Sequence, residues 1–230
     1  MQKIILFVLL ACLSWSVQAK DGYVPLQGAK YRYTFGFDVS QEYIQPINDF
    51  KQITQKNRQG MGIYVAYRTL SPWGFEFGYR WTNDKVQTLV AVPGTQLFGA
   101  TAQFANNYQG KIRLEDTYLD LYAHYPFWKR YELKLGVGVG FIRQNIVIYP
   151  ENITIIDPLS TALSELDGRT TTTARLNIGF QTLFTNRFGG RALFSFETTS
   201  SIKSTKPVQM HMFTNSYLIS LGLFYNITGY

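Results

Sequence analysis

In several short segments of this sequence apolar residues occupy every second position, and the positions between them carry charged residues, small polar residues and glycine. Between residues 75 and 81, for example, Glu76 and Arg80 alternate with aromatic residues. Successive side chains of a β-strand point to opposite faces, so such charges would gather on one face of a strand. The charged residues that we assign to this polar face are Arg32, Arg68, Glu76, Arg80, Asp120, His124, Glu132, Lys134, Arg175, Arg191 and Glu197.

Acids and bases that are confined together in this way could act in two ways. They could pair permanently as a salt-bridge plug, because an unpaired charge in a narrow interior is costly. They could instead form a polar path that conducts ions when the pairs exchange partners. The first interpretation predicts a structural network, and the second predicts a conducting lumen.

The two histidines are the remaining candidates for chemistry, and we predict that neither is catalytic. A nucleophile-and-base arrangement needs a serine or threonine beside the histidine and a third group that orients it. The sequence around His124 and around His211 supplies no obvious neighbours of this kind. We therefore expect no catalytic, cofactor or metal site, and an enzyme is the least favoured of the functions considered below, where it would be a membrane barrel that modifies lipid A.

The first residues have the pattern of a secretory signal peptide. Lys3 precedes an apolar stretch from Ile4 to Leu13, and a small-residue cleavage pattern ends at Ala19. The apolar stretch is about half as long as a helix that crosses a bilayer. An alternative interpretation takes Cys12 as the lipidated first residue of a lipoprotein. Cleavage after Ala19 would remove the only cysteine, which excludes disulfides and cysteine-based metal sites from the mature chain.

Beyond the predicted signal peptide, residues 1–19, we expect a single domain over residues 20–230. Its dominant pattern is an alternation of apolar and polar residues that recurs about eight times, as in half-buried strands. With a few flanking residues added to the shorter ones, the segments reach about 9 to 11 residues, the length that a tilted membrane strand requires. No later apolar run is long enough for a membrane helix. The alternating segments are 31–39, 61–68, 73–81, 118–125, 131–141, 174–181, 191–197 and 217–226.

The connections between these segments alternate strictly between short and long. We expect short turns at 69–72, 126–130 and 185–190, and long loops at about 41–57, 83–112, 143–168 and 199–211. Turns at one end and loops at the other are typical of a membrane β-barrel. The predicted fold is all-β: a closed antiparallel up-and-down transmembrane barrel of about eight strands, with short periplasmic turns and long extracellular loops. Residues 88–104 and 144–156 could extend the barrel wall, and residues 158–166 could form a short helical turn.

Alternation alone would also fit a secreted lipocalin-like barrel, which buries its apolar face. Two features favour lipid on the apolar side. Glycines cluster on the polar face, where an eight-stranded barrel has little room. Bulky aromatic residues lie near the strand ends on the apolar face, as in interfacial girdles. The predicted girdle residues are Tyr67, Trp73, Trp81, Tyr125, Tyr131 and Phe141.

The net charge of +7 suits contact with anionic lipid headgroups. Lysine and arginine form no dense run, and the sequence carries no nucleic-acid-binding motif. We therefore predict outer-membrane lipid and lipopolysaccharide as partners, and we expect no nucleic acid.

With these strands in view, residues 20–230 resemble the small outer-membrane barrel superfamily that includes the OmpA barrel domain, OmpX, OmpW and the opacity-type surface proteins. The resemblance is one of architecture, and it implies insertion into the bacterial outer membrane by the barrel-assembly machinery. That machinery reads a last strand with alternating apolar residues and a terminal aromatic, here residues 217–225 and Tyr230. Tyr230 is out of phase with this set, so either the strand ends at Tyr225 or a bulge near Gly229 resets the phase.

The resemblance leaves two functional hypotheses open. The first is a non-enzymatic surface barrel whose loops contact lipopolysaccharide or a host or environmental partner. The second is a small channel, either polar through the lumen or OmpW-like for hydrophobic solutes. The first predicts a closed lumen, and the second predicts conductance or solute passage.

Overall fold

The computed structural model describes most of the chain downstream of residue 30. The predicted signal peptide, His211 and Tyr230 lie outside the described residues. The described residues are 31–47, 49–69, 72–83, 87–128, 131–150, 157–165, 167–185, 187–199 and 212–229.

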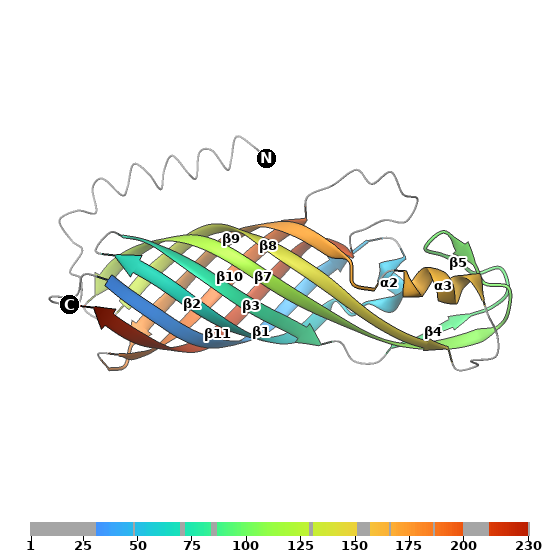
Figure 1. Ribbon diagram of the computed structural model, residues 1–230, viewed down its shortest axis with the longest axis horizontal. Helices are drawn as coiled ribbons and strands as arrows, with labels where there is room; N and C mark the ends of the chain where they lie inside the picture. Colours follow the sequence, from blue (N-terminus) through green and yellow to red (C-terminus); the bar gives the residue numbers. More distant parts are fainter. Residues whose placement is uncertain are drawn as a thin grey trace, which may run out of the picture.

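Eight long antiparallel strands close into a barrel, which confirms the predicted fold. Each strand pairs with the next along the chain, the last strand pairs with the first, and β3 pairs with β7. Figure 1 shows these strands crossing the barrel obliquely. The barrel strands are β1 (Tyr31–Pro46), β2 (Asn57–Thr69), β3 (Trp73–Asn83), β7 (Asn106–Trp128), β8 (Tyr131–Pro150), β9 (Thr170–Leu183), β10 (Phe188–Thr199) and β11 (Phe213–Gly229).

The barrel wall is apolar outside and polar inside. On β3, the outward Phe75 and Phe77 are each 55% exposed, whereas Glu76 between them is 0% exposed. The same alternation continues to the end of β11, where Ile227 faces outward and Asn226 is buried. β11 keeps its pairing with β1 in phase through Gly229, so the strand does not end at Tyr225, and no bulge resets the phase within the described residues up to Gly229.

Three glycines make room for three tyrosine rings inside the barrel. Gly36 lies opposite Tyr64, Gly78 opposite Tyr118, and Gly136 opposite Tyr122 on neighbouring strands. A Cβ atom at any of these glycines would overlap the ring of its partner. Glycine on the polar face is thus required by close approach, and the rings fill the space that it leaves.

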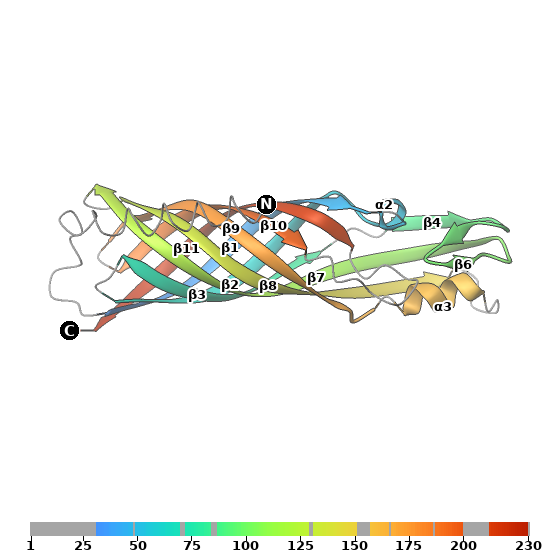
Figure 2. The same ribbon diagram turned by 90° about the horizontal axis from the view of Figure 1, so that it is seen from above.

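Beyond the loop end of the barrel, further short elements gather around the extended strands (Figures 1 and 2). β4 (Gln87–Ala91) pairs with β7, and β5 (Gln96–Leu97) pairs with β6 (Ala100–Thr101). The helices among the described residues are α2 (Phe50–Ile53) and α3 (Pro158–Ser164). Neither helix is long and apolar enough to cross a membrane, and the same holds throughout the described residues.

These elements change the expected picture of the loops. Much of residues 83–112 and 143–168 is regular structure, because β7 begins at Asn106 and β8 runs to Pro150. β1 likewise continues to Pro46, inside the expected 41–57 loop. The suggested wall extension is confirmed in part by β8 and β4, and the suggested helical turn is confirmed by α3.

The reason is a reversal of polarity along β7 and β8. Within the barrel the inward positions of β7 are polar, as at Asp116, but the next inward residues are Leu114 and Ile112. On β8 the outward position changes from exposed Phe141 to exposed Arg143. Side chains continue to alternate between inward and outward without a break, while the apolar residues move from the outward to the inward positions. The apolar outer band therefore ends here, and an ordinary water-exposed fold with a buried core begins.

We call this outer part of the molecule the cap: it consists of α2, β4, β5, β6 and α3 together with the stretches of β7 and β8 that lie beyond Asp116 and Phe141. Within the cap, Asp157 joins the start of α3 to Gln103 and Phe104. One of its carboxylate oxygens accepts from the Leu159 N–H at 2.9 Å, and the other accepts from the Gln103 and Phe104 N–H groups at 3.1 and 3.2 Å. Burial raises the pKa of the Tyr108 phenol, and the Asp157 carboxylate raises it further. The buried core of the cap consists of Ile44, Phe50, Leu89, Ala91, Leu97, Phe98, Ala102, Tyr108, Ile112, Leu114, Ile142, Ile146, Leu159, Leu163, Met212 and Phe213.

Candidate functional site

The structure places all of the predicted luminal charges on the inner face of the barrel, where they form three clusters. The loop-end cluster is built around two arginines. Arg80 contacts Asp116 and Glu197, each at 2.8 Å, and Arg175 contacts the same two carboxylates at 2.8 and 2.6 Å. Arg175 also contacts Asp120 at 3.0 Å. Two guanidinium groups thus share two carboxylates, and all five side chains are buried.

The central cluster is organised by Arg191. Its guanidinium pairs with the carboxylate of Asp38 and with Glu76, the latter at 2.7 Å. Glu76 also accepts from Lys134 at 2.9 Å and from the Tyr118 hydroxyl at 3.3 Å. Glu76 is therefore the acceptor on which two buried cations converge.

The luminal tyrosines provide a second layer of contacts for these cations. The Arg191 guanidinium lies 3.3 Å from the centre of the Tyr64 ring, and Arg175 lies 4.1 Å from that of Tyr118. Lys134 Nζ lies 4.0 Å from the Tyr122 ring. Cation–π contacts of this kind strengthen when water is excluded. The glycines leave space for the tyrosine rings, and the cations stack on those rings, so that all three groups pack together in the interior of the barrel.

The turn-end cluster surrounds a single acid, Glu132. Arg68 contacts it at 2.9 Å and Arg32 at 3.4 Å, and His124 Nδ1 lies 3.5 Å from it. The Gln181 amide also donates to Glu132. Here the positive side chains outnumber the acid, in contrast to the other two clusters.

Taken together, the three clusters pair their charges instead of leaving an open track of one sign. The paired bases are Arg32, Arg68, Arg80, Lys134, Arg175 and Arg191, and the paired acids are Asp38, Glu76, Asp116, Asp120, Glu132 and Glu197.

The predicted set of luminal charges lacks Asp38 and Asp116, and it does not foresee the stacking role of the tyrosines. The alternation places Asp38 on the polar face of the first segment together with Arg32, but Asp38 is not among the charges expected to pair. Asp116 was missed because the fourth segment was expected to begin near residue 118, whereas β7 begins at Asn106.

A layer of buried polar side chains lies between the loop-end cluster and the core of the cap. Arg58 is 1% exposed and lies at the boundary, where its guanidinium donates to the Ile112 carbonyl at 2.8 Å and approaches the Met212 sulfur at 3.9 Å. Close to this level, Glu42 accepts from the Ser216 hydroxyl at 2.8 Å. A polar boundary layer thus separates the charged lumen from the apolar core of the cap.

The predicted girdle residues lie toward the two ends of the apolar outer surface. Tyr67 and Tyr131 at the turn end are exposed, and Trp73 and Tyr125 there are half-buried. At the loop end Phe141 is exposed and Trp81 is half-buried. The sequence analysis missed a further loop-end group, in which the ring of Tyr217 lies 6.4 Å from Tyr43 and 5.3 Å from Phe196.

His124 is held in the turn-end cluster by Glu132, with its imidazole 6.2 Å from the Tyr122 ring. Within the described residues, no histidine, cysteine, aspartate and glutamate side chains gather in a group of three or more that could hold a metal ion. His211, the other candidate, lies outside the described residues.

Comparisons with known proteins agree with this architecture. No curated protein matches the chain by sequence. Among solved structures, the chain is similar to Ail, the attachment invasion locus protein of Yersinia pestis, in complex with the heparin analogue sucrose octasulfate. The TM-score is 0.51 at 12% identity, covering 86% of this chain and 99% of that one.

Two further similar structures are a major outer membrane protein from Thermus thermophilus and the neisserial surface protein NspA. The first gives a TM-score of 0.49 at 11% identity and covers 85% of this chain and 99% of that one. The second gives 0.48 at 9% identity and covers 86% and 97%. The model of a protein family described as "Outer membrane protein beta-barrel domain" matches residues 5–225. The chain therefore belongs to the family of outer-membrane β-barrel proteins.

Proposed function

We propose that this protein is a non-enzymatic surface barrel with a closed lumen, whose cap and outer rim make contacts outside the membrane. The observation that carries the proposal is the pairing of buried charges along the lumen beneath a cap with its own core. An ion entering such a lumen would have to separate buried pairs, and leaving one buried partner unpaired costs about 3–5 kcal/mol. The barrel then serves as a scaffold that holds the cap at the cell surface.

Basic residues at the rim support contact with lipopolysaccharide. Lys111 and Arg143 are exposed on the outer face of β7 and β8, and Arg113 lies beside them. Arg143 comes one outward position after Phe141 and shares a row with Glu115 and Trp81, where the apolar band ends, and Arg113 and Lys111 follow at the next two outward positions of β7. Phosphate groups of the outer leaflet would lie at this level, and cations near an anionic membrane surface attract such groups.

The Yersinia protein with sucrose octasulfate adds support of a general kind, because that ligand is a polyanion held by a protein of similar fold. A host or environmental polyanion is a further candidate for the cap. During its insertion the chain would be handled by the barrel-assembly machinery, which recognises the last strand.

The decisive test of a closed lumen is single-channel conductance of the refolded mature protein in a planar bilayer. We expect no stable conductance from protein that a heat-modifiability gel shows to be folded. Stable ion-selective steps that change when Arg80 or Lys134 is neutralised would contradict the proposal and favour the channel. Passage of a hydrophobic solute into loaded vesicles would favour the OmpW-like alternative.

Removing two rim cations should weaken lipopolysaccharide binding. Each lysine or arginine near an anionic surface contributes about 1 kcal/mol, so Lys111→Gln with Arg143→Gln should lower affinity about 30-fold at low salt. The loss should shrink as salt is raised, because exposed charges are screened. Binding of purified lipopolysaccharide to the protein in phospholipid nanodiscs measures the effect.

The matched control removes two exposed lysines elsewhere on the outer part, Lys51→Gln with Lys56→Gln. Equal losses in the two double variants would show that only total charge matters, and would contradict a rim site.

Replacing His124 by alanine should leave lipid A unchanged in cells, as expected for a protein without catalysis.

A further inference from the structure

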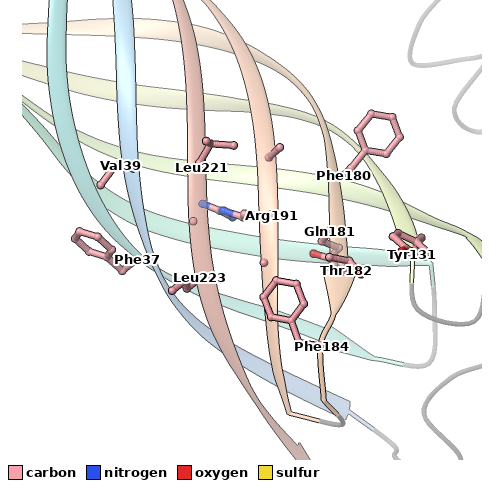
Figure 3. A pocket seen from close by; sticks show the side chains of 13 residues that line it. Phe37, Val39, Tyr131, Phe180, Gln181, Thr182, Phe184, Arg191, Leu221 and Leu223 are labelled. Atoms are coloured by element: carbon pink, nitrogen blue, oxygen red, sulfur yellow. The ribbon is translucent and has the colours of Figure 1, made fainter.

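A groove indents the outer wall of the barrel over β10. It has a volume of about 610 Å³ and lies toward the turn end of the apolar outer surface. Figure 3 shows Phe37, Leu223 and Phe184 around it, with Phe180 and Tyr131 further along the wall. Because its rim residues are outward-facing and exposed, the groove opens to the lipid and not to the lumen.

The floor of the groove arises from two small residues at successive outward positions of β10. Gly190 lies opposite Thr182 on β9 and Leu223 on β11, and Ala192 lies opposite Phe180 and Leu221. Large side chains on both neighbouring strands therefore stand above a floor that has almost no side chain. Phe184 extends over Gly190, since a Cβ atom there would lie 2.8 Å from its ring.

A cation stands in the turn next to the groove. Arg187 lies in the turn between β9 and β10, the two strands that carry the groove, and its side chain is exposed. Its guanidinium donates to the Tyr225 hydroxyl at 3.2 Å, and its carbonyl accepts from the Asn226 N–H at 2.7 Å. The turn is thereby fixed against β11, and the arginine is held at the membrane surface of the periplasmic leaflet.

We propose that the groove holds one acyl chain of a phospholipid from the periplasmic leaflet, with the anionic phosphate at Arg187. Between apolar surfaces in a membrane, association depends on close packing rather than on the hydrophobic effect. A void beside the wall forfeits dispersion contacts, so a chain that fills it is favoured over chains on the smooth wall. The complementary charge of Arg187 then selects an anionic headgroup.

A flexible chain fits this groove better than a second barrel does. The floor at Ala192 is flanked by Phe180 and Leu221, so the wall of another barrel would meet those side chains first. A single methylene chain can pass between them. The site adds a contact in the periplasmic leaflet to the proposed outer-leaflet contacts. The two proposals rest on different residues, so each can fail without the other.

The experiment is native mass spectrometry of the folded mature protein, released from detergent micelles that contain either phosphatidylglycerol or phosphatidylcholine. We expect the wild type to retain one lipid and to prefer phosphatidylglycerol about fivefold, as one membrane-surface cation allows. Ala192→Phe should abolish retention of both lipids. Arg187→Gln should remove the preference while phosphatidylcholine is still retained.

The matched control is Ala174→Phe, which enlarges another exposed outward alanine whose neighbours are Val139 and Thr198. It should retain lipid as the wild type does. If Ala192→Phe folds poorly in a heat-modifiability gel, the smaller Ala192→Leu takes its place. Retention that is equal in Ala192→Phe and the wild type would overturn the proposal. So would a wild-type dimer that Ala192→Phe converts to monomers, because the groove would then hold a second copy of the chain.

Discussion

Replacing Glu76 by glutamine is expected to lower the free energy of unfolding by about 3–5 kcal/mol, the range for breaking a buried ion pair from one side. Glu76 is fully buried and accepts from both Arg191 and Lys134. Without its charge, Arg191 keeps Asp38, but Lys134 loses its paired carboxylate. Urea titration in lipid vesicles, followed by tryptophan fluorescence, measures the loss.

A double-mutant cycle separates pairing from general damage. In the Glu76→Gln background, Lys134→Met removes the stranded charge and should recover part of the stability, so the two changes should be non-additive. Glu115→Gln serves as the control, because its pair with Arg113 at 3.2 Å lies on the outer face, is only partly buried and should contribute less than about 1 kcal/mol. Similar losses for Glu76→Gln and Glu115→Gln would contradict a packed, charge-paired lumen.

Replacing Gly78 by valine is expected to prevent the barrel from folding. The added side chain would occupy the volume of the Tyr118 ring, which is itself wedged between buried charges. Overpacking typically costs about 1–3 kcal/mol and occasionally more, and here the ring has no empty space to enter. The measurement is the fraction of heat-modifiable, folded protein after refolding into vesicles.

Rescue distinguishes this overlap from a loss of strand propensity. Adding Tyr118→Ala to Gly78→Val should restore folding, because the ring is gone and valine favours strands. Gly62→Ala is the control on the same inner face, where the nearest atom to the new Cβ is the Tyr79 carbonyl oxygen at 3.2 Å. If the double variant stays unfolded while Gly62→Ala folds, the Gly78–Tyr118 contact is not the cause.

The sequence predicted the barrel and the inner face well, since both depend on a period of two that one buried face enforces. Residues such as Glu76 and Arg175 are placed by that period alone. The pairing among them depends on strand tilt and stagger, which bring Arg80 and Glu197 together across 117 positions of sequence. Alternation on a single strand carries no information about such partners.

The cap was not predicted because the apolar residues of β7 and β8 change from outward to inward positions partway along each strand. Ile112 and Leu114 follow the rule for a water-soluble sheet, whereas Leu119 and Leu121 follow the rule for a lipid-facing one. Both pairs are apolar residues at alternate positions, and the phase differs by one residue across Asp116. A change of phase in a long alternating run, accompanied by outward charges such as Arg113, is the signal that would have located the boundary.

The continuity of β7 and β8 through that boundary has a consequence for recognition at the cell surface. A strand rises about 3.3 Å per residue, so the stretch from Phe141 to Pro150 advances about 30 Å along its own direction. The outer part of the protein is thus supported by paired β-strands that continue from the barrel wall, and not by irregular loops. An antibody or phage would meet one fixed conformation there, and sera raised against the denatured chain should bind intact cells poorly.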